Sequence, residues 1–204
     1  LASLDDRSFY DQAERIVCEV TPYKSEEQYV KDVMKGLNIP LTKINLNKAA
    51  NIIRSQGELA QLLPDSARVL KEVKNSVDKI ALISNAYPPA VEYLKKTTNL
   101  FDYFDHLFFS YERGTLKQRG LFSIAMREIG FKPDEAVIIG DNLEVDIGET
   151  YKLGIAGIWL DRKAQTVRIA KWNASNKKLT DHVYATVKDI SEVPGLVRRF
   201  FQKD

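Results

Sequence analysis

Cysteine, histidine and long hydrophobic runs are scarce in this sequence of 204 residues. The single cysteine, Cys18, excludes an internal disulfide and any zinc site built from several thiolates. The two histidines, His106 and His182, argue against a histidine-rich metal site. No apolar run approaches the roughly 20 residues that a membrane-spanning helix needs, and no signal peptide opens the chain. These absences predict a cytoplasmic protein.

The sequence also lacks an excess of charge of either sign. Lys and Arg total 30, Asp and Glu total 28, and the net charge is +2. Such a balance gives no electrostatic reason to expect nucleic acid or an anionic membrane as a partner. Hydrophobic residues make up 44% and charged residues 28%, which is typical of a folded globule. We expect a monomer or a homodimer that binds a small molecule.

The first part of the chain, residues 1–63, has helical periodicity and no convincing buried strand. Residues 8–20 read as a first helix, and Ser25 with Gln28 three residues later resembles a capping box for a second. A third helix is predicted over 46–55 and a fourth over 57–63, before Pro64. The pattern predicts a small all-helical domain.

From residue 64 to 204 short apolar runs alternate with amphipathic segments. Runs of four to six residues between helices are typical of parallel strands buried on both faces. The predicted strands lie at 80–83, 106–109, 136–139, 155–160 and 183–187, with helices at 65–74, 89–96, 119–129 and 145–153. This order predicts an α/β domain with a Rossmann-like, doubly wound parallel sheet. A polar stretch at 171–178 is predicted to be a mobile loop.

The clearest chemical signal follows the predicted strand at 136–139. Gly140-Asp141 comes directly after it, and Asp146 stands at the start of the next helix. Magnesium prefers oxygen ligands and binds through one or two carboxylates. Glycine would let the backbone approach the site closely. The alternative is structural, with Asp141 as a helix cap and Asp146 as a solvated surface acid.

Two weaker signals lie upstream. Ser84 and Asn85 end the predicted strand at 80–83, where a hydroxyl and the N–H groups of a following helix can hold phosphate. A serine in this position is more commonly a helix N-cap. Lys117 precedes a predicted helix and could neutralise a phosphate and a carboxylate, although a loop lysine is most often only solvated.

The order and spacing of these signals resemble the haloacid dehalogenase (HAD) superfamily of hydrolases, most of which are phosphatases. The segment LISNAYPPAVEYLKKTTNLFDYFDHLFFSYERGTLK resembles the family's second and third motifs, and DEAVIIGDNLEVDIGETYKLGIAGIWLDR resembles the fourth. The resemblance covers about residues 64–196, and it makes the helical domain at 1–63 a cap over an α/β core at 64–204.

The resemblance implies a role for each candidate residue. Ser84 is the hydroxyl that binds the transferred phosphoryl group, and Asn85 lines the phosphate pocket. Lys117 pairs with the nucleophile and the phosphate, and Asp141 and Asp146 hold Mg²⁺. One departure from the family concerns the position after the lysine, which is often Pro and is Gln118 here.

The largest departure is the family's first motif, an apolar strand that ends in Asp-x-Asp and supplies the nucleophile. Asp5 and Asp6 are adjacent, and too few residues precede them for a buried strand, so they are assigned to a helix start. In the family this strand lies in the middle of the sheet, and its absence would split the sheet. We expect it to exist in the protein outside this sequence.

The leading hypothesis is a Mg²⁺-dependent phosphomonoester hydrolase that acts on a small phosphorylated metabolite through an aspartyl phosphate. One alternative is a 2-haloacid dehalogenase, which needs no metal. The paired acids argue against it, because they would repel a carboxylate substrate unless a cation lay between them. The other alternative is a non-catalytic relative that binds phosphate or metal.

Overall fold

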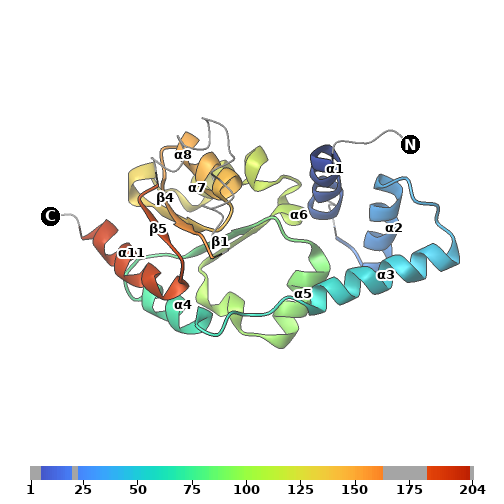
Figure 1. Ribbon diagram of the computed structural model, residues 1–204, viewed down its shortest axis with the longest axis horizontal. Coiled ribbons are helices and arrows are strands. Elements are labelled where there is room, and N and C mark those ends of the chain that lie inside the picture. Colours follow the sequence, from blue (N-terminus) through green and yellow to red (C-terminus); the bar gives the residue numbers. More distant parts are fainter. Residues whose placement is uncertain (1–5, 20–22, 163–182, 203–204) are drawn as a thin grey trace. The chain divides into compact units, whose positions relative to one another are not determined.

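The computed structural model describes residues 6–19, 23–162 and 183–202 (Figure 1). The helices are α1 (Asp6–Cys18), α2 (Glu26–Gly36), α3 (Lys43–Glu58), α4 (Ser66–Lys74), α5 (Pro88–Thr97), α6 (Ser110–Arg113), α7 (Leu121–Ile129), α8 (Glu149–Lys152) and α11 (Val193–Phe201). The strands are β1 (Ala81–Ser84), β2 (His106–Phe109), β3 (Val137–Gly140), β4 (Ala156–Leu160) and β5 (Ala185–Val187). No helix of this described part is long and apolar enough to cross a membrane.

The chain forms two compact units. Unit 1 comprises Leu1–Leu62, Leu82–Asp102 and Leu107–Leu121, and unit 2 comprises Leu63–Ala81, Tyr103–His106 and Phe122–Asp204. Unit 1 also takes in segments around β1 and β2 that the predicted core domain includes. The separation into a cap and a core stays a prediction.

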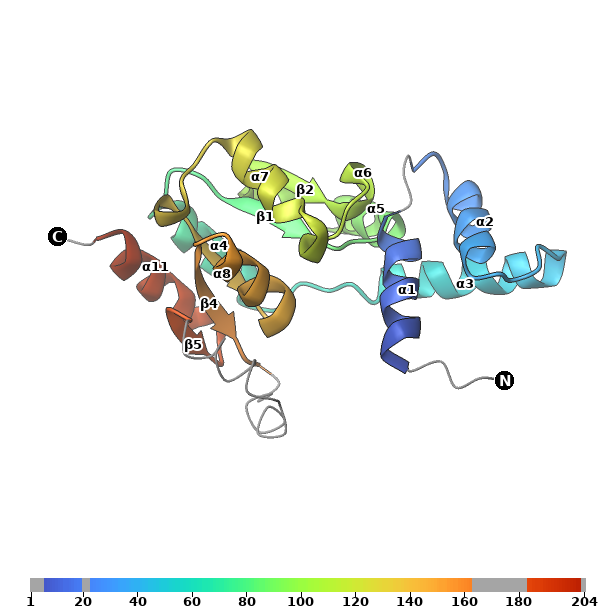
Figure 2. The same ribbon diagram turned by 90° about the horizontal axis from the view of Figure 1, so that it is seen from above.

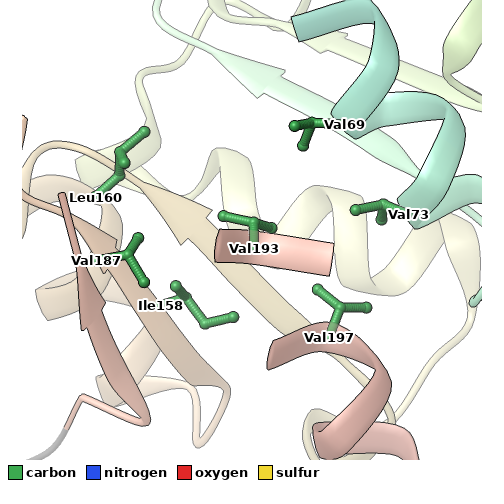
Figure 3. Close-up of a cluster of buried hydrophobic side chains, with 7 residues drawn as sticks. All are labelled: Val69, Val73, Ile158, Leu160, Val187, Val193 and Val197. Carbon is green, nitrogen blue, oxygen red and sulfur yellow. The ribbon is translucent and has the colours of Figure 1, made fainter. Parts of the chain in front are cut away.

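Unit 2 is built on a parallel sheet in the order β3-β4-β5. Side chains alternate across β4, so Ile158 and Leu160 face one side while Trp159 faces the other. On the first side α4 and α11 cover the sheet, and their valines meet β4 and β5 in one buried cluster (Figure 3). On the second side Trp159 packs with Leu143 and Ile147.

Unit 1 is mainly helical. Helix α3 packs against both α2 and α5, and α1 packs against α2 (Figure 2). Aromatic side chains make a continuous chain of ring contacts with centroid distances of 5.7–6.4 Å. Its members are Tyr23, Tyr29, Phe101, Phe109 and Tyr111. This chain connects the segment between α1 and α2 to the end of β2.

The described strands form two separate sheets. Strands β1 and β2 form a sheet of two strands, and β3, β4 and β5 form a separate sheet of three. Strand β3 therefore has β4 as its one partner among the described strands. Its Ile139 is 39% exposed, an unusual value for an isoleucine inside a strand.

The predicted α/β class is confirmed, and all five predicted strands lie within two residues of those observed. Helices α6 and α11 were not predicted, and two predicted helices differ from the structure. No helix forms at 57–63, because α3 itself continues to Glu58 and the chain then leaves the helical conformation. The helix predicted over 145–153 begins earlier, as a π-helix over Leu143–Gly148. The predicted mobile loop at 171–178 lies outside the described residues.

Candidate functional site

The first group of candidate residues lies where β1 ends, in unit 1. Ser84 is the last residue of the strand and is half-buried. Within the described part of the chain its hydroxyl has no hydrogen-bond partner. The structure thus places a hydroxyl at the carboxyl end of a strand with its hydrogen-bonding capacity unused by neighbouring residues. Such a group can donate to an anionic ligand.

Helix α5, which follows β1, does not supply the N–H donors that the sequence suggested. Its first two positions are Pro88 and Pro89, which carry no N–H. The next N–H, of Ala90, donates to the carbonyl of Tyr87 over 3.2 Å. The expectation of a helix N-terminus that binds phosphate is therefore wrong for these positions, although prolines suit the first turn of a helix.

Asn85 lies at the centre of a side-chain network in unit 1. Its Nδ2 donates to Glu14 Oε1 and to Gln118 Oε1, both over 2.9 Å. Its Oδ1 accepts the main-chain N–H of Lys117 over 2.7 Å. Gln118 Nε2 donates to Glu14 Oε2 over 3.0 Å, which closes a ring of three side chains. Both amide hydrogens of Asn85 are used here, so its main task is to connect α1 to the loop at Lys117.

Two further contacts fix this region. Ser110 is fully buried, and its hydroxyl donates to the carbonyl of Ala86 over 3.3 Å. Arg119 lies 3.6 Å from the carboxylate of Glu19, just after α1. The first contact joins the start of α6 to the segment after β1, and the second joins the loop at 117–119 to the end of α1. Lys117 begins a short 3₁₀ turn at this point and is half-buried.

The second group lies where β3 ends, in unit 2. Asp146 is 5% exposed, and its Oδ2 accepts the main-chain N–H of Asn142 over 3.1 Å. A buried carboxylate is thus held beside the residue that follows Asp141. Asp141 is more exposed, and its Oδ2 lies 3.6 Å from Arg162 Nη2. Its carbonyl accepts the indole N–H of Trp159 over 3.2 Å.

Gly140 is required by the position of Asp146. A Cβ at residue 140 would lie 2.3 Å from Asp146 Cβ and 2.5 Å from Asp146 Oδ2, so any side chain there would displace the acid. The segment after Gly140 is a π-helix, a conformation that is rare and frequent at functional sites. Asn142 caps it by accepting the N–H groups of Glu144 and Val145.

The donor set at this strand end suits magnesium. Asp141 and Asp146 lie five positions apart in the sequence, and Asp146 is held in a recess that glycine creates. Among the described residues no group of three or more His, Cys, Asp or Glu side chains could hold a metal ion. Magnesium commonly binds through one or two carboxylates and takes its other ligands from water and phosphate oxygens. Zinc and calcium sites usually have more protein ligands than these two carboxylates.

The structure places Ser84 at the end of β1 with Asn85 after it, and Asp141 directly after β3. Lys117 lies in the 3₁₀ turn after α6, and Asp146 lies in the π-helix. The structure joins Asn85 to Lys117, and Asp146 to the backbone next to Asp141. Sequence reasoning missed Glu14, which is separated from Asn85 by 71 positions and which nothing in the helical pattern of α1 marks. The sequence also shows polar residues, Asp161-Arg162, at the end of the predicted strand at 155–160, but it assigns no role to Arg162.

Comparison with known proteins gives two overlapping matches to family models. A model described as haloacid dehalogenase-like hydrolase matches residues 9–148, and one described as HAD-hydrolase-like matches residues 117–190. Together they include every candidate residue.

Two curated relatives are phosphatases. A ribulose-1,5-bisphosphate 5-phosphatase of Halopiger xanaduensis is 24% identical over 138 residues, which is 67% of this chain and 58% of that protein. A phosphoserine phosphatase of Thermus thermophilus is 28% identical over 102 residues, which is 50% of this chain and 41% of that protein. The chain spans about half the length of these relatives.

Solved structures share the fold at low identity. A HAD phosphatase from Thermococcus onnurineus has a TM-score of 0.58 and 16% identity over 94% of this chain and 80% of that chain. The L-2-haloacid dehalogenase from Xanthobacter autotrophicus has a TM-score of 0.60 and 18% identity, over 95% of this chain and 83% of that chain. The two neighbours have different activities, so this likeness describes the fold alone.

Proposed function

Because the chain belongs to the haloacid dehalogenase-like hydrolase family, we propose that it is the greater part of a Mg²⁺-dependent phosphomonoester hydrolase. Its substrate is a small phosphorylated metabolite, and the reaction passes through an aspartyl phosphate. The proposal extends to a cytoplasmic monomer or homodimer without a nucleic-acid or membrane partner.

One observation carries this proposal: the recess at Gly140 that admits the buried carboxylate of Asp146 beside Asp141. The Asp146 carboxylate accepts the Asn142 N–H next to Asp141, and carboxylate oxygens are the protein ligands that Mg²⁺ prefers. A dehalogenase of 2-haloacids has no use for such a cation. The curated phosphatase relatives favour the same choice.

In the proposed reaction Asp141 and Asp146 hold Mg²⁺, which neutralises charge on the phosphoryl oxygens. The Ser84 hydroxyl donates to a phosphoryl oxygen, and the Lys117 ammonium binds the same group and orients the nucleophile. Asn85, with both amide hydrogens engaged, acts by fixing the Lys117 loop. The nucleophilic aspartate and the acid–base aspartate come from a strand outside residues 1–204.

Activity of the protein together with its upstream segment tests the proposal. We expect phosphate release from phosphomonoesters with Mg²⁺, loss of that release in EDTA, and a reduction of at least about 100-fold in Asp141→Asn. Arg162→Gln is the matched control, because it removes the partner of Asp141 and leaves the carboxylate in place. Near-normal turnover by Asp141→Asn would contradict the metal assignment.

The same assay separates the alternatives. Halide release from chloroacetate that survives EDTA would identify a dehalogenase. Binding of inorganic phosphate without turnover of any ester, in a protein that includes an Asp-x-Asp strand, would identify a non-catalytic relative. Either result would replace the proposed function.

A further inference from the structure

We propose that Glu14 is a positioning residue, whose carboxylate sets the orientation of Asn85 and so holds the Lys117 loop in the form that binds phosphate. The inference rests on the proposed function, which assigns Ser84 and Lys117 to the phosphoryl group. It adds a residue of α1 that no motif identifies.

The geometry is a closed ring of three hydrogen bonds with one outward branch. Asn85 donates to Glu14 and Gln118 over 2.9 Å each, and Gln118 donates to Glu14 over 3.0 Å. The branch is the 2.7 Å bond from the Lys117 N–H to Asn85 Oδ1. All three ring members are partly buried, so water competes weakly for these groups.

The charge on Glu14 determines which groups of the ring donate hydrogen bonds and which accept them. An ionised carboxylate accepts hydrogen bonds and cannot donate, so both amides must turn their NH₂ groups toward it. Asn85 then has only its Oδ1 to present on the other side, where the Lys117 N–H lies. The Glu14 carboxylate on α1 thus determines the orientation of the Asn85 amide beside the Lys117 loop.

A neutral amide at position 14 cannot complete this ring. If Asn85 keeps its oxygen toward the Lys117 N–H, it must donate to both of its neighbours, 14 and 118. Residues 14 and 118 then each accept from Asn85 with the side-chain oxygen. Their NH₂ groups therefore face each other, and two donors cannot form a hydrogen bond. If Asn85 turns over, two oxygens face each other and its NH₂ meets the Lys117 N–H. Glu14→Gln therefore leaves one bond broken in every arrangement.

The ring also explains how this chain uses Gln118, at the position where the family often has Pro. A proline there would have no side-chain amide with which to close the ring. The carboxylate can therefore be moved from position 14 to position 118 without loss of a hydrogen bond in the ring. In Glu14→Gln with Gln118→Glu, Asn85 donates to both neighbours, and Gln at 14 donates to Glu at 118. All four hydrogen bonds then keep a donor and an acceptor.

The test uses ¹H–¹⁵N NMR on the unchanged protein, Glu14→Gln, and the double variant Glu14→Gln/Gln118→Glu. The readouts are the hydrogen-exchange rate of the Lys117 amide and the affinity for inorganic phosphate in the presence of Mg²⁺. Glu14→Gln is expected to raise the exchange rate and to weaken phosphate binding, each by about tenfold. The double variant is expected to restore both values to within about threefold. Glu19→Gln, which removes a neighbouring charge outside the ring, should change neither.

Several outcomes would overturn the inference. Unchanged Lys117 exchange in Glu14→Gln would show that the carboxylate does not orient Asn85. Faster exchange with unchanged phosphate affinity would make the ring purely structural. A double variant no better than Glu14→Gln would refute the polarity argument. If the unchanged protein binds no phosphate, the proposed function fails, and so does the claim that Glu14 supports phosphate binding. The Lys117 exchange rates then test only whether Glu14 orients Asn85.

Discussion

The two strand ends that carry the candidate residues are supported from very different distances along the sequence. At the end of β3, Gly140, Asn142, Asp146 and Thr150 fix one another within a span of eleven residues. At the end of β1, Asn85 is held by Glu14 and Gln118, which are 71 and 33 positions away. The first arrangement can form as soon as the local chain folds. The second requires α1, β1 and the loop at 117–119 to assemble together.

This difference predicts where the chain is sensitive to change. Substitutions at the end of β3 should act through local crowding or a lost cap. Substitutions at the end of β1 should act through the packing of α1. Each of the following changes tests this difference between local support at β3 and distant support at β1, in order of decreasing expected effect.

The reactivity of Cys18 reports most strongly on the packing of α1. Cys18 is 6% exposed, and burial, followed by the charges of Glu14 and Glu19, raises the pKa of its thiol to about 12. The thiolate is the reactive species, so alkylation by iodoacetamide near pH 8 should be about a thousandfold slower than for an exposed thiol. The same chain in urea is the control, since it has a single cysteine. Equal rates in both states would mean that α1 is not packed.

Gly140→Ala tests the local support at β3. Its Cβ would lie 2.3 Å from Asp146 Cβ, so we expect the free energy of unfolding to fall by about 2–3 kcal/mol. Gly195→Ala, in α11, is the control. No atom lies within 4 Å of its added Cβ, and alanine in a helix should raise stability by about 0.5–1 kcal/mol. Equal stability of the two variants in urea titrations would remove the packing argument for Gly140.

Asn85→Ala and Asn142→Ala compare the two kinds of support directly. Asn85→Ala leaves Glu14 and Gln118 with only their bond to each other and removes the acceptor of the Lys117 N–H, and should cost about 2–3 kcal/mol. Asn142→Ala removes an exposed cap of two N–H groups and should cost about 1 kcal/mol. Urea titration of both variants gives the comparison. A larger loss for Asn142→Ala would reverse the distinction drawn here.

Glu19→Gln should have the smallest effect. Its ion pairs with Arg15 and Arg119, at 3.4 and 3.6 Å, involve arginines that are 56% and 45% exposed. Solvent screens such pairs, so the expected change in the free energy of unfolding is below about 0.5 kcal/mol. A loss as large as that of Asn85→Ala would mean that surface charge, rather than the Asn85 ring, holds α1 in place.

The same contrast explains what the sequence could reveal. The strand at 106–109 was predicted with its observed bounds, and the predicted Ser25 cap is confirmed by its bond from the Gln28 N–H. These features depend on neighbouring residues, as does the placement of Asp146 beside the residue after Asp141.

What the sequence could not reveal depends on tertiary structure. Glu14 has the sequence context of any acid on an amphipathic helix, and its importance arises only when α1 meets Asn85. The π-helix at Leu143–Gly148 replaces a predicted α-helical start because the buried carboxylate must turn back toward Gly140. Helix α3 continues to Glu58, beyond the predicted end at residue 55, although it includes Gly57, a poor helix former.

The most direct test of the account is the dependence of phosphate binding on magnesium. Titration of inorganic phosphate, followed by NMR, should shift the amide signals of Ser84 and Lys117, and Mg²⁺ should shift those of Asp141–Asp146. If the two strand ends serve one phosphate reaction, Mg²⁺ should tighten phosphate binding by about tenfold, and Asp141→Asn should abolish that gain. Phosphate affinity that is the same in Mg²⁺ and in EDTA would contradict the proposed metal-dependent phosphatase.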